Sequence, residues 1–292
     1  MIIDCHMHYD PEMFPLERML ASMETHGIAK TALIPTMVEP FSLAGRAAKS
    51  AGDLLRFNLL HFPPLGRFFY DALTLNKRGY FVLLGKKYRI YEKPDNAPVA
   101  EAIEKHPDKF LGWIFINPAA DSDPVTEIER WSSHPGMVGV KAHPFWHMYA
   151  IERLDAAAGW CREQGYPLLI HLGSRRGSGD YRRLPEKYPG LKVLYAHAGI
   201  PYYKELWAYI KDKKDVYIDL SSPYLNQDLV RRAVDFLGAD RCLYGTDGPY
   251  GEQQMGEDYD YAWIKGWIES LPLAAAEIEK IFSDNFASIA KS

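Results

Sequence analysis

Short apolar runs alternate with segments of helical spacing along most of this chain. The runs that predict strands are residues 2–8, 31–37, 110–117, 137–143, 167–172, 191–197, 216–220 and 242–247. Apolar residues recur every three or four positions, as in amphipathic helices, over residues 15–27, 99–106, 124–132, 151–164, 182–187, 202–211, 227–237 and 259–290. Near-continuous apolar strands between helices indicate a parallel sheet that is covered on both faces. Eight such units in 292 residues predict an α/β fold, the (β/α)8 TIM barrel.

The alternative architecture is a doubly wound open sheet. It is less favoured because no glycine-rich phosphate loop follows the first predicted strand. The sequence contains no evident linker or low-complexity tract, so we expect residues 1–292 to form a single domain.

Residues 38–98, after the second predicted strand, are too many for a simple connection. They combine amphipathic helical patterns with a cluster of aromatic residues, so we predict a helical insertion. Insertions of this size are usually active-site lids or oligomer surfaces. The alternative is a peripheral helical decoration without a role at the site.

Ionisable residues stand at the ends of five of the eight predicted strands. They are His6 and His8, Lys141 and His143, His171, His197, and Asp247. The carboxyl ends of the strands form the active-site face of such a barrel. A buried, unpaired charge would be costly at these positions, and a shared metal ion removes that cost. The pattern therefore predicts a metal site.

His6 and His8 project from the same face of an extended strand, so both rings could reach one ion. With His171 and Asp247 they would give a nitrogen-rich ligand set suited to Zn²⁺, with Fe, Mn or Co as alternatives. An ion in such an open site activates water or polarises a substrate oxygen. His197 is then free to act as general acid or base, and Asp247 could also accept a proton from water.

Several short motifs carry a resemblance to a known family. They are His6 and His8 in the first strand, GVKAHP (139–144), LLIHLGS (168–174), YAHAG (195–199), YGTDGPY (244–250) and SDNFASI (283–289). Together they resemble the amidohydrolase superfamily, and in particular the branch that includes aminocarboxymuconate semialdehyde decarboxylase and aromatic acid decarboxylases. The resemblance extends from the first strand to residue 289 and is weakest over residues 38–98. It implies that His6, His8, His171 and Asp247 are metal ligands and that His197 assists catalysis.

Lys141 leaves the number of ions open. Superfamily members with two metals carry a carboxylated lysine at the corresponding place, so one ion is our expectation and a second is possible if Lys141 is carboxylated. Lys141 and His143 face the same way in a strand and could both meet an anionic group of the substrate. The alternative for His143 is that it only orients the loop before Pro144. Arg175, just after His171, is a candidate for binding a substrate carboxylate.

We consider three functions for this site. The leading hypothesis is a metal-dependent hydrolase, in which activated water attacks an ester, lactone or amide of a small organic molecule. The second is a non-oxidative decarboxylase that removes CO₂ from an aromatic or unsaturated carboxylic acid. The third is a metal-binding barrel without catalysis, which is disfavoured because a structural site needs no spare acid–base group such as His197.

Composition and charge limit the kinds of partner that the protein is expected to bind. A net charge of −4 and a pI near 6.2 give no electrostatic case for nucleic acid or anionic membranes. The three cysteines lack any CxxC spacing, His6 leaves no room for a signal peptide, and no apolar run is long enough to span a bilayer. We therefore expect a cytoplasmic enzyme with a small-molecule substrate, and the aromatic-rich insertion makes a homodimer plausible.

Overall fold

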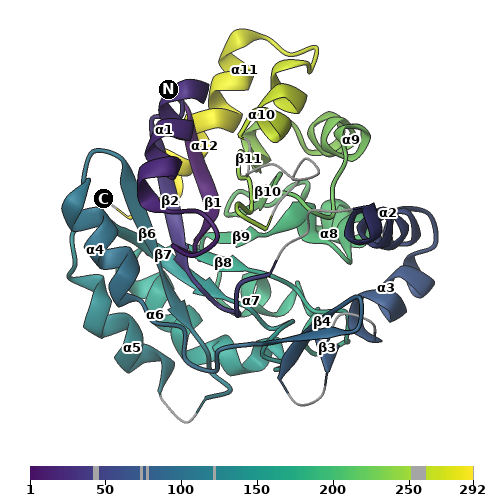
Figure 1. Cartoon of the computed structure of the whole chain (residues 1–292), viewed down its shortest axis with the longest axis horizontal. Coiled ribbons are helices and arrows are strands. Elements are labelled where there is room, and N and C mark those ends of the chain that lie inside the picture. The colour runs from purple at the N-terminus through teal and green to yellow at the C-terminus, as the bar shows by residue number, and fades with distance from the viewer. Residues whose placement is uncertain (42–45, 73–74, 77–78, 121–122, 251–260, 292) are drawn as a thin grey trace.

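Eight parallel strands form a nearly closed barrel at the centre of the structure, a computed structural model of the chain (Figure 1). The structure describes residues 1–41, 46–72, 75–76, 79–120, 123–250 and 261–291. The strands follow one another around the barrel in chain order: β1 (Ile3–Tyr9), β2 (Lys30–Pro35), β6 (Phe110–Ile116), β7 (Met137–Ala142), β8 (Leu168–Ile170), β9 (Val193–Tyr195), β10 (Val216–Asp219) and β11 (Cys242–Leu243). The predicted (β/α)8 barrel is confirmed.

The first strand closes the barrel against the segment that follows the last one. The amide of Cys5 donates to the carbonyl of Tyr244 at 3.0 Å, and the amide of Asp247 donates to the carbonyl of His6 at 2.7 Å. The buried Asp4 carboxylate accepts hydrogen bonds from the amide and the hydroxyl of Thr246, at 3.1 and 2.5 Å. These contacts bring His6 beside Asp247, although the two lie at opposite ends of the sequence.

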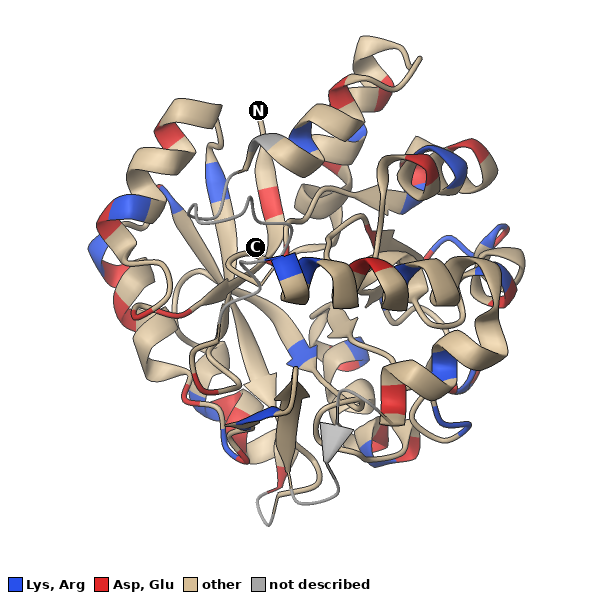
Figure 2. Cartoon of the chain, turned by 45° about the vertical axis from the view of Figure 1, so that its right-hand side comes forward, with Lys and Arg blue, Asp and Glu red and all other residues tan. Residues whose placement is uncertain are grey.

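Helices surround the barrel, and charged residues lie along them as well as in the loops (Figure 2). They are α1 (Leu16–His26), α4 (Ala97–Lys105), α5 (Pro124–Ser132), α6 (Asp155–Gln164), α7 (Arg183–Lys187), α8 (Tyr203–Ile210), α9 (Gln227–Leu237), α10 (Ala262–Glu269), α11 (Ala275–Glu279) and α12 (Asn285–Ile289). Short helical turns occupy Ile151–Leu154, His197–Gly199 and Ala239–Arg241, and a π-helical turn joins α11 to α12 at Lys280–Asp284. Within the described ranges, no helix is both long enough and apolar enough to cross a membrane.

Two of these helices begin at a residue whose side chain caps the helix. Asp123 caps α5 by accepting a hydrogen bond from the amide of Val125, and Asn226 caps α9 through the amide of Leu229. The predicted helix over 259–290 is divided into four pieces, because Pro272 cannot continue α10. Residues 259 and 260 of that prediction lie outside the described residues.

The barrel interior is tightly filled beside β7. Trp113 of β6 is fully buried, and its indole nitrogen donates to the carbonyl of Cys5 at 2.9 Å. A methyl group on Gly139 would lie 2.3 Å from the Trp113 ring, so only glycine fits at that position.

The predicted insertion lies between β2 and α4 and contains more than helices. Helices α2 (Arg46–His61) and α3 (Pro63–Ala72) are followed by a three-stranded antiparallel sheet, β3 (Leu75–Asn76), β4 (Tyr80–Leu83) and β5 (Lys86–Arg89). The helical part of the prediction is confirmed, but the small sheet was not predicted. α2 and α3 lie beside α8 (Figure 1), where the Tyr203 hydroxyl donates to the Leu60 carbonyl at 3.1 Å. Arg67 and Glu205 form an ion pair at 2.6 Å across the same boundary.

Candidate active site

The ionisable residues predicted at the strand ends meet at one end of the barrel. They are His6, His8, Lys141, His143, His171, His197 and Asp247, and none is more than 6% exposed. They come from β1 and from the ends of β7, β8, β9 and β11. Parallel strands place their carboxyl ends on the same face, so residues that are far apart in sequence converge there.

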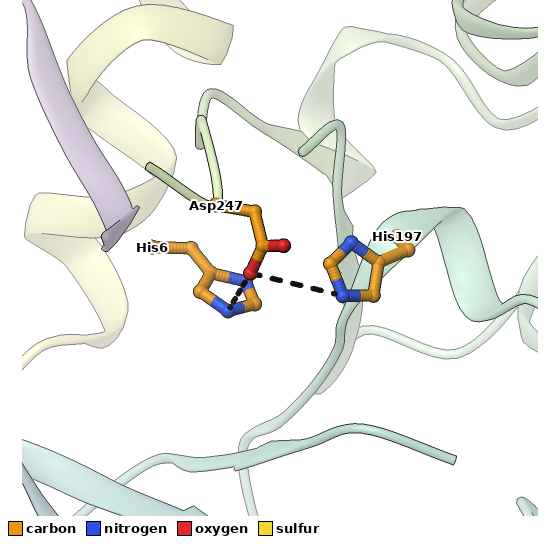
Figure 3. A group of neighbouring side chains, drawn as sticks. All are labelled: His6, His197 and Asp247. Carbon is orange, nitrogen blue, oxygen red and sulfur yellow. Dashed lines mark ion pairs between the residues drawn. The ribbon is translucent and has the colours of Figure 1, made fainter. Parts of the chain in front are cut away.

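Asp247 is the centre of the cluster (Figure 3). Its Oδ1 lies 3.2 Å from Nε2 of His6, 3.4 Å from Nε2 of His8 and 4.0 Å from Nε2 of His197. His6, His197 and Asp247 each offer one ligand atom, and these atoms all lie within 4.8 Å of one another. Nδ1 of His171 lies 3.1 Å from Nε2 of His197, so a fourth imidazole borders the same space.

Two of these residues have an unusual backbone conformation. His197 and Asp247 have φ angles of 53° and 58°, in the left-handed region that residues other than glycine seldom adopt. Such conformations concentrate at functional sites, where the surrounding structure holds them in place. Here the Asp247 amide donates to His6, and the His197 amide donates to Asp219 at 2.9 Å.

The outer nitrogens of two imidazoles are held by partners in β10 and just after it. Nδ1 of His6 lies 2.8 Å from Oδ2 of Asp219. Nδ1 of His197 lies 2.9 Å from Oγ of Ser221 and 3.2 Å from the carbonyl oxygen of Ser221. A carbonyl or carboxylate oxygen only accepts, so the hydrogen of each neutral ring is on Nδ1 and the lone pair of Nε2 points inward.

The Nε2 lone pairs of His6 and His197 show whether these residues could bind a metal ion. They face the Asp247 carboxylate, which is also an acceptor, inside a buried site. Acceptors facing one another without water are unfavourable unless a cation lies between them. Imidazole nitrogen with carboxylate oxygen is a donor set that suits Zn²⁺ or Mn²⁺. The His–His–Asp group could therefore hold a divalent ion.

The protonation states agree with this assignment. Burial alone would raise the pKa of Asp247, but its contacts with His197, His6 and His8 hold that pKa well below its usual value. Burial lowers the pKa of His8 to about 4 and the pKa of His171 well below its usual value. Asp247 is thus ionised and His8 and His171 are neutral, the forms that bind metal. Burial would also lower the pKa of His6, but its contacts with Asp219 and Asp247 outweigh burial and raise that pKa above its usual value.

Lys141 and His143 lie beside the cluster. The amine of Lys141 is fully buried, 3.4 Å from Nε2 of His6, and burial lowers its pKa to about 8. His143 accepts a hydrogen bond at Nδ1 from the amide of Trp146, and its ring stacks on His171 at a centroid distance of 4.0 Å. His143 therefore both orients the loop after β7 and borders the site.

Arg175 has a different partner from the one that the sequence suggested. Its guanidinium group is 58% exposed and pairs with Asp71 of α3 at 2.9 Å. It is not among the residues that line the cavity described next. A role in substrate binding stays a prediction that the geometry does not support.

A cavity of about 500 Å³ opens above the cluster. Its base is formed by His8, His143, His171 and Asp247. Its wall comes largely from the insertion and is mostly apolar, with Phe41, Leu54, Leu55, Phe69, Phe81, Leu83 and Leu84, together with Trp146, Tyr224 and Tyr250. A small-molecule site with an apolar wall and convergent polar groups at one end has this form.

Sequence analysis missed three residues of this site. Asp219 ends an apolar strand, the same signal that marked the histidines, and could have been found in that way. Ser221 follows in a loop without a distinguishing pattern. Tyr70 reaches His171 from the insertion, with its hydroxyl 2.5 Å from Nε2, and no local signal in the sequence points to that contact.

The comparisons with solved structures agree on the fold. The 2,6-dihydroxybenzoate decarboxylase in complex with 2,6-dihydroxybenzoate is 14% identical, with a TM-score of 0.60 over 99% of this chain and 98% of that chain. A putative 2-pyrone-4,6-dicarboxylic acid hydrolase from Pseudomonas putida is 16% identical, with a TM-score of 0.61 over 99% and 96%. A dihydroxybenzoic acid decarboxylase from Polaromonas sp. JS666, with bound manganese and the inhibitor 2-nitroresorcinol, is 15% identical, with a TM-score of 0.62 over 99% and 96%.

Sequence comparison identifies the family. No curated protein sequence matches the chain. The profile of the amidohydrolase family, by contrast, matches residues 3–287, which include every residue of the cluster. This match spans nearly the whole chain and confirms the resemblance carried by the histidine and aspartate motifs. The chain therefore belongs to the amidohydrolase family of enzymes.

Proposed function

We propose that the protein is a metal-dependent hydrolase acting on an ester, lactone or amide of a small, largely apolar molecule. The observation that carries the proposal is the buried cluster of His6, His197 and Asp247, of which Asp247 also lines the base of the cavity. We assign His6, His8, His171 and Asp247 as the residues that would hold one divalent ion, for which Zn²⁺ is our first choice. Mn²⁺ is the alternative, since a structural neighbour carries manganese.

The residues around this site have distinct tasks. When bound, a divalent ion would polarise the substrate carbonyl and acidify a water molecule. Asp247, ionised and within 3.2–3.4 Å of two imidazoles, is the group that accepts the proton of the attacking water. We assign His197 to acid–base catalysis at Nε2, which takes up a proton and then passes it to the leaving group, while Ser221 and Asp219 fix the orientation of the ring. The apolar wall excludes bulk water from the reacting atoms.

The lining of the cavity supports hydrolysis of an uncharged group. Among its described residues the only lysine and arginine are Lys49 and Arg56, both on α2, and Arg56 pairs with Asp53. No arginine stands beside His143 or His171 in the lining to receive a carboxylate. A neutral ester, lactone or amide needs no such partner.

Decarboxylation is the second candidate, and two observations favour it. The buried Lys141 lies 3.4 Å from His6 and could attract an anionic substrate. Phe41 stacks on Tyr250 at an interplanar angle of 4°, and both line the cavity, which suits a flat aromatic ring. Several neighbours of known structure are decarboxylases of hydroxylated benzoates by their names.

One experiment separates these candidates. The purified protein, loaded with Zn²⁺ or Mn²⁺, is incubated with a panel of aryl esters, lactones and anilides and with a panel of hydroxybenzoates, and acid release and CO₂ are measured. We expect one ion per chain, acid release without CO₂, and loss of both activity and ion in Asp247→Ala. CO₂ release from the benzoates alone would establish the lyase instead. No metal uptake would overturn both.

Two finer expectations accompany this proposal. Large apolar side chains are exposed on the insertion, namely Leu54, Phe57, Phe62, Leu65, Phe68 and Leu84, and they support a homodimer formed through α2 and α3. Sedimentation of the pure protein tests the proposed homodimer.

The three cysteines are free and buried, which supports a reducing compartment such as the cytoplasm.

A further inference from the structure

We propose that the insertion completes the metal site through Tyr70, a positioning residue that fixes the His171 ring so that Nδ1 faces the ion. The inference rests on the proposed metal site, but it does not depend on which reaction the site performs. It assigns a role to residues 38–98, where the resemblance to the family is weakest.

Tyr70 packs against residues at the end of the barrel. It belongs to α3 of the insertion and is completely buried. Its hydroxyl lies 2.5 Å from Nε2 of His171. Its ring stacks on Phe145 at a centroid distance of 4.0 Å and meets Tyr224 edge-on at 5.2 Å. A side chain packed against two aromatic rings in this way has little freedom to move the hydroxyl.

An ion bound at Nδ1 would select one tautomer of His171. Nδ1 lies 3.1 Å from Nε2 of His197 and so faces the cluster, whereas Nε2 faces Tyr70. A neutral imidazole that offers the Nδ1 lone pair carries its hydrogen on Nε2, and the Tyr70 oxygen then accepts that hydrogen. The hydroxyl hydrogen of Tyr70 remains for Tyr224, with which Tyr70 also shares a hydrogen bond. Tyr70 thus does for His171 what Asp219 does for His6.

The origin of this partner is what distinguishes it. Asp219 and Ser221 belong to β10 and the loop after it, so the barrel itself orients His6 and His197. Tyr70 comes from the insertion, which is tied to the barrel next to the site. Asp71, the next residue, pairs with Arg175 in the loop that follows His171, at 2.9 Å.

Docking of the insertion and metal binding are therefore coupled. If Tyr70 favours the metal-binding tautomer of His171, a bound ion in turn favours the docked position of α3 by the same free energy. Partners of metal-ligating histidines typically change metal affinity by about 10- to 100-fold when they are removed.

The test compares two tyrosine-to-phenylalanine variants. Tyr70→Phe removes the hydroxyl at His171 and keeps the ring in its stack. Tyr203→Phe is the matched control, because Tyr203 is also buried and its hydroxyl also joins the insertion to the barrel, at the carbonyl of Leu60, without touching a histidine. Affinity for Zn²⁺ is measured by competition with a chelator, without substrate, and the visible spectrum of the Co²⁺-loaded proteins reports the ligands. Melting of the metal-free proteins measures stability.

We expect Tyr70→Phe to weaken Zn²⁺ binding about 10-fold or more and to change the Co²⁺ spectrum. Tyr203→Phe should lower the melting temperature but leave affinity and spectrum as in the wild type. Unchanged affinity in Tyr70→Phe, or an equal loss in Tyr203→Phe, overturns the inference. A wild-type protein that binds zinc but hydrolyses nothing would contradict the proposed function and leave this inference standing.

Discussion

The barrel and the insertion contribute different things to the same site. The barrel supplies the ionisable groups, and each is fixed by the backbone at a strand end, as His6 and Asp247 are by their mutual hydrogen bond. The insertion supplies the apolar wall of the cavity and one hydroxyl group, that of Tyr70. Chemistry and choice of substrate are therefore encoded in separate segments, and substitutions in each should affect different measured quantities.

The largest effect should come from the centre of the barrel. Asp247→Asn keeps the shape of the side chain but removes the charge that three imidazoles surround. We expect turnover to fall by about 10³-fold or more, since a general base contributes 10²–10⁴-fold and the metal ligand is weakened as well. Steady-state kinetics and metal analysis at saturating Zn²⁺ measure the two losses. Full activity in this variant would remove Asp247 from the mechanism.

The second prediction concerns packing in the barrel alone. Gly139→Ala would place a methyl group 2.3 Å from the Trp113 ring, and such overpacking costs about 1–3 kcal/mol. Gly266→Ala is the control, because this exposed helical position has no atom within 4 Å and alanine there should stabilise by up to about 1 kcal/mol. Urea unfolding of both metal-loaded variants provides the comparison. Equal stability of the two would mean that β7 can shift to accept the methyl group.

Substitutions in the insertion should change KM for the substrate. Leu54 is 61% exposed and lines the cavity, whereas Phe57, on the same helix, is 51% exposed and does not line it. Leu54→Asp should raise KM for an apolar substrate by about 3- to 10-fold, corresponding to part of the burial energy of a leucine side chain. Its kcat and metal content should stay unchanged. Phe57→Asp should leave KM unchanged, and a rise in both variants would point to a general disturbance of α2.

The smallest effect should lie on the outer surface of the barrel. A hydrogen bond from Arg183, and then one from Lys187, hold the pKa of Asp155 below its usual value. A lowered folded pKa adds stability above the unfolded pKa of about 3.9, and this stability is lost as the pH falls through the folded value. Asp155→Asn should therefore cost less than about 1 kcal/mol at pH 7 and progressively less as the pH falls below about 3.9. Urea titrations across this range measure it, and a cost independent of pH would argue against the ion pairs.

The sequence predicted the barrel well, for a physical reason. Strands buried on both faces must be apolar, so an ionisable residue such as His171 or Asp247 stands out at a strand end. Asp219 carried the same signal. Tyr70 could not be found in this way, because a tyrosine in an aromatic-rich helix looks like any core residue until the tertiary fold places its hydroxyl beside His171. Arg175 illustrates the opposite error, since closeness to His171 in sequence did not bring its side chain to the cavity.

The way in which the barrel closes has a consequence for biosynthesis. Asp4 and Thr246 are separated by 242 residues, and their hydrogen bonds join the first strand to the last. A nascent chain leaves the ribosome from its N-terminal end, so β1 is made long before Thr246 and Asp247 are translated. Throughout that interval His6 and His8 lack Asp247. The cluster can therefore form only after all eight strands of the barrel have been translated.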